Sequence, residues 1–174
     1  MPILTSPFAS LDLLRQPEQP NEPLKAFDAA DEYLLGQLQA DGLPAEARVL
    51  IINDSFGALA ASLAPHARVS SWGDSHLAHL ALVKNLARNQ LPADRVHFIP
   101  ASEPVQGLFD RVLIRVPKTL ALLEEQLIGL HGHLAPGAQV VAGAMLKHLP
   151  RAAGDLLQKY IGPVHASLAQ EKAR

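Results

Sequence analysis

The sequence predicts an α/β fold, a mostly parallel, doubly wound sheet with helices on both faces. Short apolar runs rich in β-branched residues alternate along the chain with segments whose apolar residues recur at helical spacing. Such alternation is typical of parallel strands joined by crossover helices. With 48% hydrophobic and 18% charged residues among 174, the chain can bury the core that this fold requires.

The first 22 residues contain four prolines and show little periodicity, which predicts an extended arm. We therefore divide the chain into this arm, 1–22, and one domain, 23–174. A helix should begin the domain, with Asn21 as its cap and Pro23 in its first turn, and it should end near Gly42.

Strands and helices are then expected to alternate to the end of the chain. The apolar runs predict strands at 48–53, 67–72, 96–99, 109–116, 139–144 and 164–169, and the helical stripes predict helices at 56–63, 75–89, 119–131 and 151–160. Glycine and proline between 132 and 137 predict a loop before the strand at 139. Folds of this kind bind ligands at the carboxyl ends of the strands, near the switch point.

Composition excludes several classes of protein. The absence of cysteine rules out a disulfide framework, a cysteine nucleophile and a thiolate zinc site. No apolar run approaches the roughly 20 residues of a membrane span, and the first residues do not resemble a signal peptide, so we expect a soluble cytoplasmic protein. The net charge of −2 lacks the basic excess of most nucleic-acid binders, so any RNA contact must be a local patch.

The turn after the first domain strand has the outline of a cofactor-binding motif. In Rossmann-like methyltransferases this turn usually reads strand, acid, Gly-x-Gly-x-Gly, helix, because glycine lets the backbone approach S-adenosylmethionine closely. Here only Gly57 remains. Asn53 and Ser55 stand at the other glycine positions, and Ile51 stands where the acid usually lies. The turn is either an altered cofactor site or, as we favour, a connection without a ligand.

Asp74 lies near the end of the second domain strand, where an acid commonly accepts hydrogen bonds from ribose hydroxyls. It is equally suited to cap the helix that begins at Ser75, and we favour this second role. Together with Asn53, Ser55 and Gly57 it would form a vestigial pocket, in which we expect no bound cofactor.

The segment after the fourth domain strand lacks a catalytic motif. Enzymes that methylate exocyclic base amines carry Asn/Asp-Pro-Pro-aromatic here, which orients the amine by hydrogen bonds and stacking. This chain has Leu113-Ile-Arg-Val-Pro-Lys-Thr119, in which Arg115 and Lys118 flank one proline. Because cations accept no hydrogen bonds from an amine, we expect no catalytic residue.

The same segment could instead contact RNA. Arg115 and Lys118, beside the first turn of the helix near Thr119, form a candidate phosphate site. The alternative is a solvated loop. A second candidate patch lies around Lys147 and Arg151.

Three segments resemble the N-terminal half of the ribosomal RNA large subunit methyltransferase G family. They are Phe27-Asp-Ala-Ala-Asp-Glu-Tyr-Leu-Leu35, Leu50-Ile-Ile-Asn-Asp-Ser-Phe-Gly-Ala-Leu59 and Arg115-Val-Pro-Lys-Thr-Leu-Ala-Leu-Leu-Glu124. The resemblance spans nearly the whole chain, and the related small subunit methyltransferase C family shares the same plan.

This resemblance implies a class I methyltransferase fold and a parent with two tandem methyltransferase-like domains. The C-terminal domain would carry the intact motifs and transfer methyl from S-adenosylmethionine to N2 of a guanine in large-subunit rRNA. The N-terminal domain would support folding and RNA recognition. We therefore expect this chain to be inactive alone, with rRNA and the C-terminal domain as its partners.

Other sites are poorly supported by the sequence. His76 and His79, and likewise His131 and His133, are spaced closely enough for a metal, but no suitable third ligand accompanies them, so we expect no metal. The main alternative is an independent S-adenosylmethionine-dependent small-molecule methyltransferase with an unusual cofactor turn. A further alternative is a structural partner domain without RNA contact.

Overall fold

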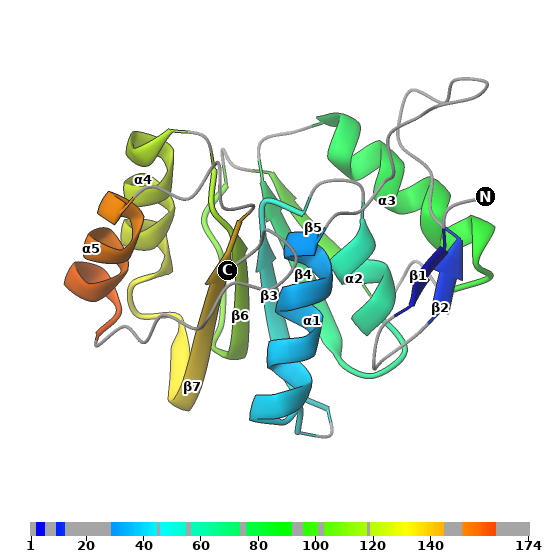
Figure 1. Ribbon diagram of the computed structural model, residues 1–174, viewed down its shortest axis with the longest axis horizontal. Coiled ribbons are helices and arrows are strands. Elements are labelled where there is room, and N and C mark those ends of the chain that lie inside the picture. The colour runs from blue at the N-terminus through cyan, green and yellow to red at the C-terminus, as the bar shows by residue number, and fades with distance from the viewer. Residues whose placement is uncertain are drawn as a thin grey trace.

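The computed structural model describes residues 3–5, 10–12, 29–44, 46–54, 57–73, 76–91, 96–100, 103–117, 119–144 and 151–162. Its domain elements form three layers, with a central sheet between two groups of helices (Figure 1). Within the described residues, no helix combines the length and the apolar character that crossing a membrane requires.

The central sheet has five strands, and every neighbouring pair is parallel. Their spatial order is β5 (Val96–Pro100), β4 (Arg68–Gly73), β3 (Arg48–Ile52), β6 (Phe109–Arg115) and β7 (Leu134–Gly143). The chain moves outward from β3 to β5 and then returns to the other side of β3, so the switch point lies between β3 and β6. The predicted doubly wound α/β sheet is therefore confirmed.

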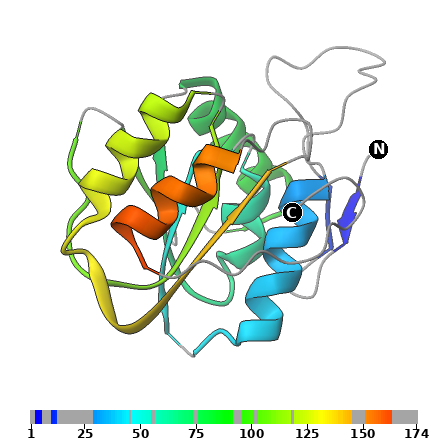
Figure 2. The same cartoon turned by 60° about the vertical axis from the view of Figure 1, so that its left-hand side comes forward.

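Helices cover both faces of the sheet (Figures 1 and 2). The first face carries α1 (Ala29–Asp41), α2 (Ala58–Leu63) and α3 (His76–Arg88), and the second carries α4 (Leu120–Leu130) and α5 (Arg151–Tyr160). Successive side chains of β3 point to opposite faces, so Ile51 packs in the first core while Leu50 and Ile52 pack in the second. Burial on both faces explains why the strands read as continuous apolar runs.

The N-terminal region contains more structure than an extended arm. β1 (Ile3–Thr5) and β2 (Ser10–Asp12) pair antiparallel, with Ile3 opposite Asp12. The predicted helix caps, Asn21 and Pro23, lie outside the described residues, as does the strand predicted at 164–169. The division of the chain at residue 22 stays a prediction.

The predicted loop between 132 and 137 is confirmed at Gly132 and His133 but was wrong for 134–137, because β7 already begins at Leu134. Phe109 of β6 lies opposite Leu134, whereas Arg111 lies opposite Gln139, so β7 contains extra residues at this point. Pro136 and Gly137, which has φ 77°, belong to this irregularity. Proline and glycine are tolerated in an edge strand at a bulge, where one strand carries residues that the ladder does not pair.

Candidate functional site

The site predicted from the sequence lies where β3 and β6 end. Ile52 lies opposite Ile114, so the next residues, Asn53 and Arg115, occupy neighbouring strand ends at the switch point. Open α/β sheets bind their ligands at this position. We call the carboxyl ends of β3 and β6 the switch-point edge.

The side chain of Asn53 joins three elements across this edge. Its Nδ2 donates to the Arg115 carbonyl oxygen at 3.0 Å and to Gln126 Oε1 at 2.9 Å. Gln126, which is buried on α4, donates in return from Nε2 to Asn53 Oδ1 at 2.7 Å. We call these contacts the Asn53 bridge. They connect the two strands of the switch point to each other and to α4 by protein side chains.

The backbone of Asn53 is suited to this bridge. Its φ is 68°, in the left-handed region, which asparagine tolerates better than most residues other than glycine. Its N–H also donates to the Trp72 carbonyl oxygen at 3.0 Å. Asparagine therefore supplies the turn geometry of a glycine together with an amide that holds the neighbouring strand.

Asp54 accepts hydrogen bonds from backbone N–H groups at the start of α2. Its buried carboxylate accepts hydrogen bonds from the Leu59 N–H at 3.3 Å and from the Ala60 N–H at 3.0 Å. The first amides of a helix have no intrahelical acceptor, and a carboxylate there is also favoured by the helix dipole. These two donors at the start of α2 are thus already used inside the protein.

Gly57 is needed for packing. Its φ is 85°, and a Cβ at this position would lie 2.7 Å from Leu82 Cα, a backbone atom of α3. No rotation of the Leu82 side chain could relieve such a contact. The one glycine left in the degenerate motif is therefore required by the close approach of α3.

Arg115 is paired inside the domain. Its Nη1 donates to Asp31 Oδ1 at 2.6 Å, and the two side chains are 18% and 1% exposed. The pair ties the first turn of α1 to the end of β6. Of the predicted contacts, the structure thus brings Asn53 and Arg115 together, whereas Ser55, Asp74 and Lys118 lie outside the described residues, as does Lys147.

The structure also places Ile51 and His133, which the sequence singled out as motif and metal positions. Ile51, at the expected acid position, is fully buried in the core under α1, α2 and α3. His133 Nδ1 lies 2.8 Å from the Gly107 carbonyl oxygen, and since a carbonyl can only accept, Nδ1 is the donor of this hydrogen bond. Among the residues that the structure describes, no group of three metal-binding side chains occurs.

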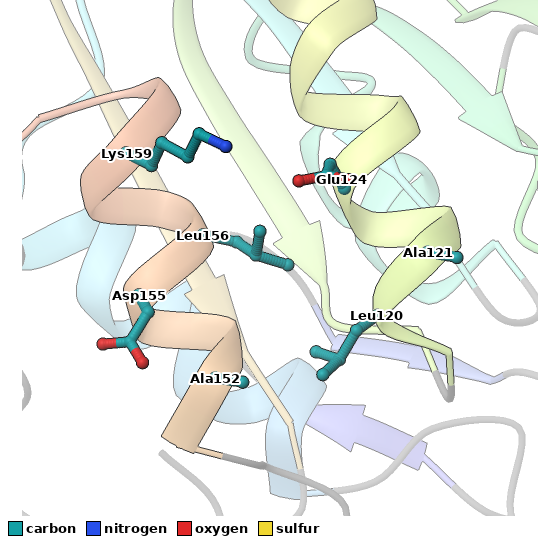
Figure 3. Close-up of a pocket in the computed structure, with 7 residues that line it drawn as sticks. All are labelled: Leu120, Ala121, Glu124, Ala152, Asp155, Leu156 and Lys159. Atoms are coloured by element: carbon teal, nitrogen blue, oxygen red, sulfur yellow. The ribbon is translucent and has the colours of Figure 1, made fainter.

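A pocket of about 320 Å³ lies between α4 and α5 (Figure 3). Leucine and alanine side chains line it, with Glu124, Asp155 and Lys159 around them. Leu156 points from α5 towards α4, and Tyr160 donates from its hydroxyl to the Glu124 carboxylate at 3.0 Å. These contacts hold α5 against α4, and they do not form a general acid–base or nucleophile arrangement.

Sequence reasoning missed three polar partners of the site: Asp31, Asp54 and Gln126. The sequence contained a signal for two of them, Asp31 and Gln126. Asp31 lies one turn before Leu34 and Leu35, and Gln126 lies between Leu123 and Leu130 on the inner stripe of its helix. A lone polar residue on an apolar stripe needs a buried partner, because an unpaired polar group in the core is costly.

Two solved structures with a similar fold are methyltransferases by name. Precorrin-6y C5,15-methyltransferase from Geobacter metallireducens matches with a TM-score of 0.64 and 15% identity, covering 86% of this chain and 75% of that chain. The N-methyltransferase NodS from Bradyrhizobium japonicum matches with a TM-score of 0.61 and 18% identity, covering 82% and 89%. At these identities the similarity establishes the Rossmann-like methyltransferase fold alone.

Curated relatives are much closer in sequence. The ribosomal RNA large subunit methyltransferase G of Stutzerimonas stutzeri is 78% identical, and that of Pseudomonas putida strain W619 is 74% identical, both over 174 residues. Each match covers all of this chain but 46% of the relative, so the chain spans about half the length of these relatives. The family model of the RLMG N-terminal domain matches residues 1–174. The chain therefore belongs to the RLMG N-terminal domain family, as the resemblance in its sequence predicted.

Proposed function

We propose that this chain is the non-catalytic N-terminal domain of an rRNA (guanine-N2-)-methyltransferase that acts on large-subunit rRNA. In this role it supports RNA recognition and the folding of the catalytic half. The Asn53 bridge is the observation that carries the proposal. A cofactor at the switch-point edge would have to displace the amide contacts between Asn53, Gln126 and the Arg115 carbonyl.

The residues at this edge do not fit S-adenosylmethionine. Two glycine positions of the motif carry side chains, the acid position is the buried Ile51, and two α2 amides already bind Asp54. The parent would therefore use S-adenosylmethionine in its C-terminal domain, and the partners of this chain are that domain and rRNA in the bacterial cytoplasm.

The alternative is an independent small-molecule methyltransferase with an unusual cofactor turn. It requires the Asn53 bridge to open and the α2 amides to exchange Asp54 for a ligand. It also requires an acceptor site for the substrate, where β6 instead ends in the Arg115–Asp31 pair. These contacts favour the non-catalytic role.

Titration with S-adenosylmethionine distinguishes the two functions. We expect isothermal titration calorimetry to detect no binding by this chain, because two or three unmade polar contacts, at about 1–3 kcal/mol each, remove most useful affinity. The full-length protein should bind one cofactor per chain, which serves as the positive control. Micromolar binding by the 174-residue chain would support the independent enzyme.

Methyl transfer tests the proposal directly. Incubated with protein-free large-subunit rRNA and labelled S-adenosylmethionine, the chain alone should transfer no methyl, because the side chain that ends β6 is a guanidinium, which cannot accept a hydrogen bond from a guanine amine. The same residues joined to the C-terminal domain should support transfer. Label in the rRNA with the chain alone would contradict the proposal.

The sequence suggested Arg115 and Lys118 as RNA contacts, and for Arg115 the ion pair limits this role. A phosphate would have to share the guanidinium with the carboxylate of Asp31, which is almost fully buried. Leaving a buried carboxylate without its cation is costly. We therefore expect Arg115 to contribute little to RNA affinity.

A further inference from the structure

We propose that the amino-terminal edge of the sheet, through Arg48 and Arg68, is the surface that contacts RNA phosphates. This inference rests on the RNA-handling function proposed above and names its contact surface. The edge consists of the first residues of the parallel strands, opposite the switch-point edge. The expected contact is with the sugar-phosphate backbone and does not read base sequence.

Arg48 is an exposed guanidinium held in a defined position. It lies over the ring of Phe109, 5.1 Å from the ring centroid, and Gly107 leaves room for it, since a Cβ there would be 2.5 Å from Nη1. Among the described residues, no carboxylate lies within ion-pair distance of it. An ordered guanidinium with unused donors matches the geometry of a phosphate and loses little side-chain freedom on binding.

Arg68 lies beside it. Arg48 and Arg68 begin neighbouring strands and are directly opposite each other in the register, so their Cα atoms lie about 5 Å apart. Arg68 pairs with Glu46 at 3.3 Å, but the side chains are 70% and 67% exposed, and exposed pairs of this kind contribute little and exchange readily. Two adjacent arginines can thus face a single RNA backbone.

A third arginine strengthens the positive potential of this edge. Arg111 donates to the Gly42 carbonyl oxygen at 3.0 Å and to the Asp110 carbonyl oxygen at 2.8 Å, so its charge is not neutralised by these contacts. The Asp110 carboxylate itself accepts the backbone N–H of Arg48. When helix ends are counted as well, the described residues at this edge are five basic and three acidic: Arg48, Arg68, Arg88, Arg111 and Lys159, and Asp41, Glu46 and Asp110.

The switch-point edge has the reverse charge balance, with more acidic than basic residues. Of the described residues near the carboxyl ends of the strands, four are acidic, Asp31, Glu32, Asp54 and Glu103, and two are basic, Arg115 and Arg151. A polyanion is attracted to the edge with excess positive charge even when the net charge of the protein is −2. This contrast favours RNA on the side of the sheet away from the vestigial cofactor site.

The test is RNA binding as a function of salt concentration, with fluorescence anisotropy of a labelled mixed-sequence single strand and of an RNA hairpin. The double variant Arg48→Gln/Arg68→Gln removes both proposed contacts. The variant Arg48→Lys/Arg68→Lys keeps both charges, and Lys84→Gln removes one exposed charge from the middle of α3 as a control. Thermal unfolding verifies that all variants are folded.

The glutamine pair should flatten the slope of log affinity against log salt by about 1.4 on the single strand and about 1.8 on the hairpin stem. The lysine pair and the Lys84→Gln control should retain the wild-type slope. If the wild-type chain binds RNA and the glutamine pair shows the same slope, the proposed surface is wrong while the RNA role stands. The same conclusion follows if the slope of the lysine pair is flattened as much as that of the glutamine pair. If the wild-type chain binds neither RNA at low salt, both the surface and the RNA role are wrong.

Discussion

Replacing Arg115 by methionine should lower the free energy of unfolding by about 3–5 kcal/mol, the range for removing one partner of a buried ion pair. The reason is that the Asp31 carboxylate, 1% exposed, would lose its guanidinium while remaining in the protein interior. A loss of this size is a large part of the total stability of an ordinary domain. Urea unfolding followed by circular dichroism measures it.

The control is the double variant Asp31→Leu/Arg115→Met. Exchanging a buried ion pair for apolar side chains of similar size is often neutral, so the double variant should be clearly more stable than Arg115→Met alone. If the double variant and Arg115→Met lose equal amounts of unfolding free energy, the ion pair does not have the proposed stabilising role. The comparison also matters for RNA-binding experiments. An Arg115 variant that unfolds would lose its affinity for RNA even if the Arg115 side chain makes no contact with RNA.

Gly57→Ala should destabilise the domain by about 2–5 kcal/mol. A left-handed backbone costs an alanine about 1–2 kcal/mol, and forcing extra volume into a packed site adds about 1–3 kcal/mol. Both apply here, because φ is 85° and the new Cβ would be 2.7 Å from Leu82 Cα. The same unfolding measurement gives the value.

Gly42→Ala isolates the conformational part of this loss. Gly42 has φ 91°, and a Cβ added there would have no other atom within 4 Å, so its substitution should cost only the left-handed conformation, about 1–2 kcal/mol. The difference between the two variants measures the contact between α2 and α3. Losses of the same size would show that Leu82 can move away.

The order of strands and helices could be predicted because burial on both faces leaves a strong local pattern. The runs that became β3 and β6 are largely apolar, and the stripe of α4 recurs at helical spacing. The start of β7 could not be predicted in this way. Pro136 and Gly137 ordinarily end a strand, and only the pairing of β7 with β6 shows that they belong to a bulge.

The candidate site could be predicted only in part. The sequence indicated that Asn53 and Arg115 stand at motif positions, because those positions are defined by the local strand and turn. Their partners are distant: Gln126 is 73 residues from Asn53, and Asp31 is 84 residues from Arg115. Which polar residue meets which depends on how α1 and α4 pack on the sheet, and this is a property of the tertiary structure.

The Asn53 bridge also bears on how the domain responds to the metabolic state of the cell. A fold whose strand ends are held by a dissociable ligand gains stability with ligand concentration, about 2.7 kcal/mol at a hundredfold excess over Kd. Here the corresponding contacts come from Asn53 and Gln126, which are always present because they belong to the chain. On the proposal that this chain binds no cofactor, its folded fraction is expected to stay constant when the supply of methyl donor falls.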